Sequence, residues 1–278
     1  METTTMTGGA LDVRQPAVSG RFYPARADEL RAEVLKFLGG QATGKHHHGV
    51  VAPHAGYVYS GPIAGKVFAD TMVPRRVIVL APNHTGRGAR IAVWPRGAFA
   101  LPGDEVPVDE ELAARLIEAS VGCVADREAH RFEHALEVEL PFVRARNPDA
   151  IVTPIILGGL DGDECIALGR TLAEIVATLD EDVLVVASSD MSHYLPDDVT
   201  RTIDRQAIEP MVACDPSRLF DVVEREDISM CGILPATTML SYARARGATH
   251  GTLIAYGTSA DAFGDTDRVV GYAGLAID

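Results

Sequence analysis

The sequence has few cysteines, few basic residues relative to its acidic ones, and no long apolar segment. Its four cysteines, Cys123, Cys165, Cys214 and Cys231, are scattered and form no C-x-x-C pair. Scattered thiols are typical of a reduced cytoplasmic protein and argue against a disulfide framework. No apolar run approaches the roughly 18 residues that a membrane-spanning helix needs. We therefore expect a cytoplasmic protein that does not enter a membrane.

The charge balance excludes one class of partner. The chain has 278 residues, with 25 lysines and arginines against 39 aspartates and glutamates, which gives a net charge of −14. A surface of that sign repels nucleic acid and anionic lipid. The first residues are polar and rich in threonine, without the basic and apolar regions of a signal peptide, so we expect a flexible tail over residues 1–12.

Short apolar runs alternate with segments of helical periodicity along the chain. Strands are expected at 49–53, 76–81, 151–157 and 182–188, a short β excursion at 90–103, and an antiparallel pair at 251–257 and 268–277. Helices are expected at 27–38, 62–71, 109–119, 133–145, 163–179, 197–213, 216–226 and 234–246. This alternation predicts an α/β fold, a single three-layer α/β/α domain over residues 1–278 with a central, largely parallel but mixed sheet.

Three histidines follow directly after expected strands. His54, His84 and His193 each lie in a turn just beyond an apolar run. The carboxyl ends of strands in open α/β sheets converge on one crevice, and imidazole is the commonest metal ligand in proteins. The pattern favours a shared metal site, with Tyr57 and Tyr194 as candidate pocket residues.

Cys231 is a candidate third ligand. It lies just before the helix expected at 234–246, and a helix N-terminus lowers the pKa of a thiol. A buried, apolar cysteine is the alternative interpretation. A set of two histidines and a thiolate suits iron, copper or zinc rather than magnesium or calcium.

Two other histidine patterns compete with this site. His130 and His134 match the H-x-x-E-H pattern of zinc peptidases, which requires both histidines on one face of a helix. Residues 46–48 are three consecutive histidines, which could bind a stray metal ion or form a solvated loop.

Six segments together resemble the Memo (mediator of ErbB2-driven cell motility) family, whose prokaryotic members are also called AmmeMemoRadiSam system protein B. The resemblance covers about residues 13–277. The segments are residues 14–24 (RQPAVSGRFYP), 53–61 (PHAGYVYSG), 82–84 (PNH), 133–142 (EHALEVELPF), 188–193 (SSDMSH) and 231–232 (CG).

The resemblance implies a fold shared with class III extradiol dioxygenases, which are non-haem Fe(II) enzymes. It implies that His54, His84 and Cys231 occupy the metal-ligand positions, with Asp190 and His193 beside them. In this interpretation His193 acts as general acid or base and Asp190 orients it. Those dioxygenases carry a glutamate where this chain has Cys231, and a thiolate changes the charge and redox behaviour of the metal. That departure weakens the expectation of ring cleavage.

The family pattern also accounts for Glu133 and His134 without a peptidase, and it makes His134 a pocket residue. The expected cofactor is a transition metal, Fe(II) first and copper or zinc as alternatives, in a dioxygenase-like or redox site. Two further functions stay open, namely a non-catalytic module that binds a peptide in the same crevice and a zinc-dependent hydrolase. The ligand would be a small molecule or a peptide, and the prokaryotic family name implies radical SAM and AMMECR-type protein partners.

Overall fold

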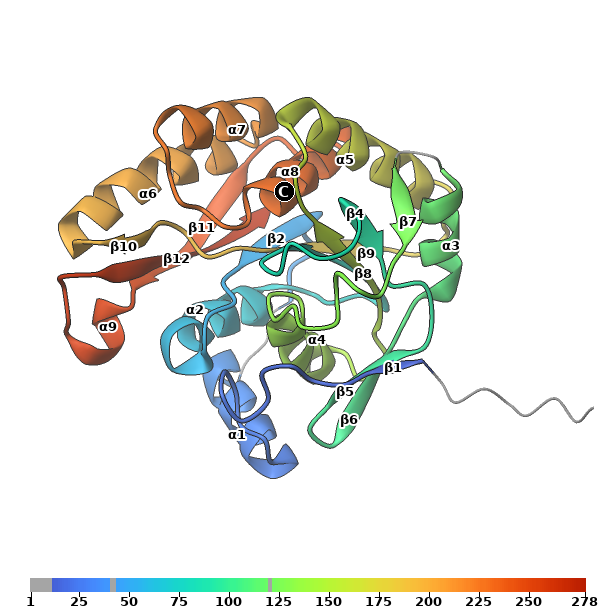
Figure 1. Ribbon diagram of the computed structural model, residues 1–278, viewed down its shortest axis with the longest axis horizontal. Helices are drawn as coiled ribbons and strands as arrows, with labels where there is room; N and C mark the ends of the chain where they lie inside the picture. Colours follow the sequence, from blue (N-terminus) through green and yellow to red (C-terminus); the bar gives the residue numbers. More distant parts are fainter. Residues whose placement is uncertain (1–11, 41–43, 120–121) are drawn as a thin grey trace, which may run out of the picture.

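A computed structural model describes residues 12–40, 44–119 and 122–278. Most of the tail expected over residues 1–12 therefore lies outside the described residues. A sheet runs through the middle of the molecule with helices on both faces (Figure 1). In the described part of the chain, nine strands form this sheet in the order β10-β12-β2-β9-β3-β8-β4-β7, with β11 also paired to β12. The predicted mixed α/β architecture is confirmed.

The middle of this sheet is parallel, its neighbours on both sides pair antiparallel, and β7 at one edge is parallel to β4. Strands β2, β9, β3 and β8 are parallel neighbours, whereas β12 pairs antiparallel with β2 and β11, and β4 pairs antiparallel with β8. The strands are β2 (Gly49–Ala52), β3 (Arg76–Pro82), β4 (Ile91–Val93), β7 (Cys123–Ala125), β8 (Ile151–Leu157), β9 (Val183–Ser188), β10 (His193–Leu195), β11 (Gly251–Thr258) and β12 (Val269–Ile277).

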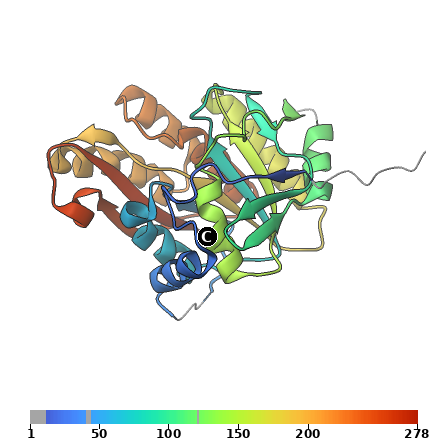
Figure 2. The ribbon, with the colours of Figure 1, turned by 60° about the horizontal axis from the view of Figure 1, so that its bottom comes forward.

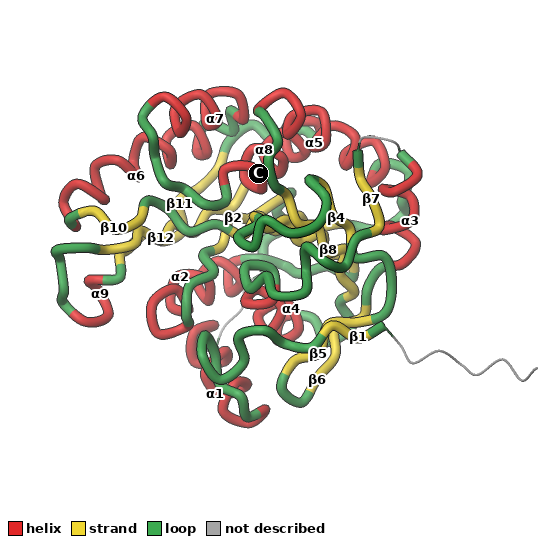
Figure 3. Tube along the Cα trace, viewed as in Figure 1, coloured by secondary structure: helices red, strands yellow, loops and turns green. Residues whose placement is uncertain are grey.

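Helices cover both faces of the sheet, as Figure 2 shows from a second direction and Figure 3 by colour. One face packs against α1 (Ala27–Leu38), α2 (Tyr57–Asp70) and α4 (Leu140–Arg146). The other packs against α3 (Glu110–Glu118), α5 (Gly162–Val176), α6 (Asp197–Val212), α7 (Pro216–Arg225) and α8 (Ile233–Ala245). The short elements are α9 (Ala260–Phe263), the 3-10 turn η1 (Glu137–Glu139), and a small sheet of β1 (Val13–Arg14), β5 (Ala98–Leu101) and β6 (Asp104–Pro107).

Alternating residues of the central strands enter opposite cores. Ile78 and Leu80 pack with α5 and α8, whereas Val77 and Val79 pack with α1 and α2. Because successive side chains of a strand point to opposite faces, a strand covered on both sides must be apolar throughout. This is why the central strands appear in the sequence as unbroken apolar runs. None of the described helices is long and apolar enough to cross a bilayer.

Two expected helices differ from the structure. The helix expected from Pro62 begins at Tyr57, because the amides of Tyr59 and Ser60 already bond to the Gly56 carbonyl. The helix expected over 133–145 is replaced by η1 and α4, which begins only at Leu140.

In the second case the cause is a side chain. The Glu133 carboxylate accepts the amides of His134 and Ala135, a local arrangement that competes with a helix over these residues.

Candidate metal centre

The candidate site lies at the carboxyl ends of three adjacent parallel strands. His54 follows β2 by two residues, His84 follows β3 by two residues, and β9 lies between these strands and ends at Ser188. The segment after β9 carries Asp190 and leads to His193, the first residue of β10. Parallel strands therefore bring residues more than a hundred positions apart to one edge of the sheet.

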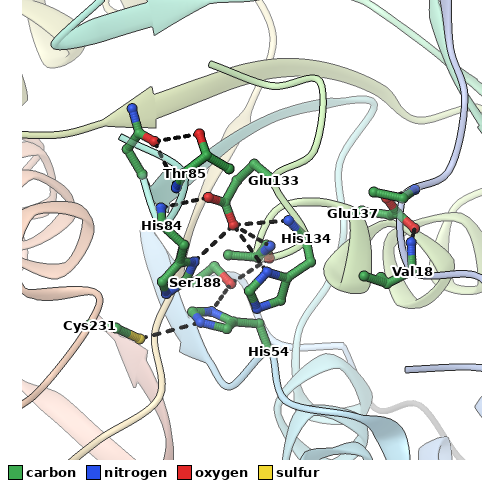
Figure 4. Close-up of polar contacts among 12 residues, drawn as sticks. Val18, His54, His84, Thr85, Glu133, His134, Glu137, Ser188 and Cys231 are labelled. Atoms are coloured by element: carbon green, nitrogen blue, oxygen red, sulfur yellow. Dashed lines mark hydrogen bonds and ion pairs between the residues drawn. The ribbon is translucent and has the colours of Figure 1, made fainter. Parts of the chain in front are cut away.

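His54, His84 and Cys231 meet at this edge (Figure 4). The His54 Nε2 atom is 3.3 Å from the Cys231 sulfur, and the two imidazole centroids are 5.3 Å apart. One potential ligand atom from each residue lies within 4.8 Å of the other two. Ligands that share one ion at 2.0–2.3 Å are up to about 4.6 Å apart. The three donors therefore fit a single transition-metal ion with only small adjustment.

His84 is held from behind by a buried carboxylate. Its Nδ1 is 2.9 Å from Glu133 Oε1, and its amide donates to Glu133 Oε2 at 2.7 Å. The amides of His134 and Ala135 donate to the same Oε1 at 2.9 and 3.0 Å. With its acceptor sites occupied, Glu133 supports His84 and leaves Nε2 of that ring to bind a ligand.

The local charges raise the pKa of His84. Burial alone would lower it, but the hydrogen bond and the negative charge of Glu133 outweigh burial. Burial would likewise raise the pKa of Glu133, yet its contacts with His84 and nearby amides lower it. The two groups therefore stabilise each other's charge, and the Glu133 carboxylate holds the His84 ring in place.

His54 is held differently, by a hydroxyl. Its Nδ1 is 2.8 Å from Ser188 Oγ, the last residue of β9. Ser188 Oγ also lies 2.7 Å from the Ala135 carbonyl and 2.9 Å from Glu139 Oε1. His54 is 1% exposed, and burial lowers its pKa well below the ordinary value, with the neighbouring histidines adding to the effect. An uncharged imidazole is the form that binds a metal.

Cys231 lies at the opposite side of the cluster. Its sulfur accepts the Asp190 amide at 3.3 Å. The sequence led us to expect a lowered thiol pKa, because α8 begins at Ile233 just after this residue. The structure reverses that expectation, since burial first and the nearby Asp190 second raise the pKa of Cys231 well above its usual value. A metal ion bound at this position would have to displace the thiol proton.

Asp190 and His193 both lie at the crevice, but Asp190 does not orient His193. His193 Nδ1 faces the Ser229 carbonyl at 2.8 Å, and its amide donates to Ser229 Oγ. Asp190 Oδ1 instead accepts the His54 amide at 2.8 Å. Burial raises the pKa of Asp190 to about 7 and lowers that of His193. Ser229 therefore fixes the tautomer of His193, and Asp190 fixes the backbone of His54.

A crevice of about 670 Å³ lies beside the candidate site, and its lining includes Asp190 and His193 but not His54, His84 or Cys231. His134, Asp190, His193 and Tyr194 line it, together with Tyr59. The structure places Tyr57 in the core rather than in the crevice wall, because its side chain is buried and its hydroxyl donates to the Val138 carbonyl at 2.8 Å.

The competing histidine patterns have other roles. The H-x-x-E-H segment is not helical, and His130 is buried 3.0 Å from the Ala92 carbonyl beside the Trp94 ring. Within residues 46–48 the middle histidine is not solvated. His47 is buried, with one ring nitrogen at Asp70 and the other at Asp278. Among the described residues, His47 and His130 belong to no group of potential metal ligands, whereas Glu133 and His134 form a second such group with His84.

The sequence interpretation assigned no supporting role to Glu133, Ser188 and Glu139, which lie behind His84 and His54, or to Ser229, which lies behind His193. It includes Glu133 in the peptidase pattern and in the family resemblance, but not as the partner of His84. A run with glutamates at 133, 137 and 139 among apolar residues is a usable signal, because buried carboxylates require specific partners.

Comparison with known sequences gives full-length matches. Residues 14–276 match the family described as Memo-like protein. The chain is 36% identical over 279 residues to the MEMO1 family protein MK0963 of Methanopyrus kandleri, covering 95% of this chain and 98% of that protein. It is 36% identical over 265 residues to a MEMO1 family protein of Aquifex aeolicus, with coverage of 95% and 98%.

A comparison of structures agrees on the fold. The uncharacterized protein JW3007 from Escherichia coli K12 superposes with a TM-score of 0.57 and 16% sequence identity, covering 82% of this chain and 98% of that one. At that identity the likeness concerns the architecture alone.

Proposed function

This chain belongs to the Memo family, and we propose that it is a metal-binding member with a redox or dioxygenase-like site at His54, His84 and Cys231. One observation carries the proposal. Both imidazoles engage protein partners through Nδ1, which leaves each Nε2 for a metal, and the His54 Nε2 already lies against a sulfur. A thiolate with two imidazoles favours Fe(II) or copper, and zinc is the alternative.

A bound redox-active ion would supply Lewis acidity and electron transfer. The surrounding side chains would transfer a proton, position the ligands and control access to the site. His193, whose pKa is lowered by burial and whose Nδ1 is committed to Ser229, presents its Nε2 as a general base toward a hydroxyl of the ligand. Asp190 keeps His54 in place through its amide, and the rings of Tyr59 and Tyr194 limit how a ligand enters the crevice.

The central experiment is an anaerobic Fe(II) titration of the metal-free protein. Wild type should bind one equivalent, and Cys231→Ala and His54→Ala should each lose more than about a hundredfold in affinity, beyond what loss of a supporting residue costs. Cys123→Ala and His250→Ala are the matched controls, since they remove the same groups away from the site. Equal affinity in wild type and Cys231→Ala would remove the thiolate from the ligand set.

A second candidate function is peptide binding in the same crevice. Large aromatic side chains are exposed at its rim, with Phe263 66% and Tyr194 64% exposed. Exposed aromatic residues are typical of binding surfaces. Iron-loaded protein that consumes no oxygen with catechols or thiols, yet binds a peptide that Tyr194→Ala fails to bind, would favour this function over turnover.

A further inference from the structure

Three glutamates within seven residues are buried beside the site. Glu133, Glu137 and Glu139 are 1%, 1% and 0% exposed. A buried carboxyl group is stable as an anion only when several donors surround it, and otherwise it keeps its proton. The three side chains differ sharply in this respect.

Glu137 provides a reference for the ionised form. It accepts the amides of Ala17 and Val18 at 2.7 and 3.1 Å, the Tyr23 hydroxyl at 2.6 Å and the Arg14 guanidinium. Glu133 likewise faces three amides and His84 Nδ1. Each of these two carboxylates therefore has four donor groups.

Glu139 has no comparable set of donors. Its Oε1 contacts the Ser188 hydroxyl, and its Oε2 is buried without a hydrogen-bond partner among the residues that the structure describes. Burial and the nearby Asp190 raise the pKa of Glu139 well above its usual value. Among the described residues, the Ser188 hydroxyl is the sole hydrogen-bond partner found at this carboxyl group.

Counting protons at Ser188 gives the same answer independently. Its oxygen has three contacts, with His54 Nδ1, the Ala135 carbonyl and Glu139 Oε1. A serine hydroxyl donates once and accepts twice. The carbonyl can only accept, so the serine proton belongs there. The other two contacts are hydrogen bonds only if His54 Nδ1 and Glu139 Oε1 each carry a proton.

We infer that Glu139 is a neutral carboxylic acid that acts as a positioning residue, because it donates to Ser188 and holds the oxygen that also accepts from His54 Nδ1. This arrangement fixes the tautomer of His54 with a bare Nε2 facing Cys231. The protonation of Glu139 and the tautomer are properties of the metal-free protein. Their importance for metal affinity rests on the proposed function.

The test begins with metal-free protein at neutral pH. In infrared difference spectra, Glu139→Gln should remove one protonated-carboxyl band, whereas Glu105→Gln, at an exposed position, should remove a carboxylate band only. Nitrogen-15 NMR should find His54 protonated at Nδ1 in wild type and in Glu139→Gln, because an amide also donates to Ser188. Glu139→Leu leaves the Ser188 proton on the Ala135 carbonyl and should keep the tautomer, whereas Ser188→Ala removes the acceptor of His54 Nδ1 and should shift it. Loss of a carboxylate band in Glu139→Gln, or an unchanged tautomer in Ser188→Ala, would overturn the inference.

A metal titration then measures the consequence. Co(II) affinity should be similar in wild type and Glu139→Gln and about ten- to a hundredfold weaker in Glu139→Leu, the usual range for loss of a group that supports a ligand. If Glu139→Leu does not fold, Ser188→Ala interrupts the same chain and should give the same loss. Wild-type protein that binds no metal would overturn the proposed function, whereas the spectra of the metal-free protein would still decide the state of Glu139.

Discussion

The two histidines of the candidate site are held by opposite means. His84 is supported by an ionised glutamate that four donors surround, and its side chain is 33% exposed. His54 is 1% exposed and is supported by a serine backed by a glutamate that lacks donors. A buried anion is stable where donors surround it, and a neutral hydroxyl takes its place where donors are absent. Similar strand-end positions therefore produce different electrostatic surroundings for the two histidines.

The largest expected effect comes from Glu137→Gln. This variant tests whether a buried carboxylate near the site contributes to the stability of the fold without affecting metal affinity. Glu137 and Arg14 form a buried ion pair, with side chains 1% and 3% exposed. Removing one partner of a buried pair should cost about 3–5 kcal/mol of unfolding free energy, measured by urea denaturation. Fe(II) affinity of the folded protein should stay within about threefold, well below the cost of losing a supporting residue. A tenfold loss would mean that this segment couples the N-terminal strand to the metal centre.

Glu133→Gln should weaken metal binding by about ten- to a hundredfold, because it removes the charge that supports His84. Glu128→Gln is the matched control, since Glu128 pairs with Arg87 at the surface, where such pairs contribute about 0–1 kcal/mol. Isothermal titration with Fe(II) under nitrogen gives both values. If Glu133→Gln binds Fe(II) as tightly as wild type, the negative charge of Glu133 does not contribute to metal affinity. The electrostatic difference between His84 and His54 would then have no effect on metal binding.

The sequence was sufficient for the layered fold and for the strand-end cluster, because both depend on local patterns. Unbroken apolar runs predicted β3, β8 and β9, and a histidine after a strand predicted a place at the sheet edge. The supporting residues could not be found that way. Glu139 and Ser188 are 49 positions apart, and their contact depends on how η1 packs against the end of β9. The same limit applies to Cys231, where the helix start was visible but the burial that raises the thiol pKa was not.

The smallest expected effect is on the pH dependence of stability, and it follows from the opposite pKa directions of the two histidines. The pKa of His54 is lowered by burial, so its contribution to stability is present above the unfolded value of about 6.5 and is lost as the pH falls through the folded value. The pKa of His84 is raised overall because Glu133 outweighs burial, so its contribution is present below the unfolded value and is lost as the pH rises through the folded value. Acidification therefore reduces the contribution of His54 to the free energy of unfolding and increases that of His84.

Glu133→Gln should remove the second contribution and leave the first, so the metal-free variant should lose stability more steeply than wild type between pH 7.5 and about pH 5.5, on either side of the ordinary histidine pKa. Urea-unfolding free energies at the two pH values, with a chelator present, measure the slope. Proton NMR of the imidazoles should find His84 protonating at higher pH than His54 in wild type, and the gap should narrow in the variant. Equal slopes in the two proteins would mean that the Glu133 carboxylate does not stabilise a protonated His84, and that the two sides of the site differ in burial but not in charge.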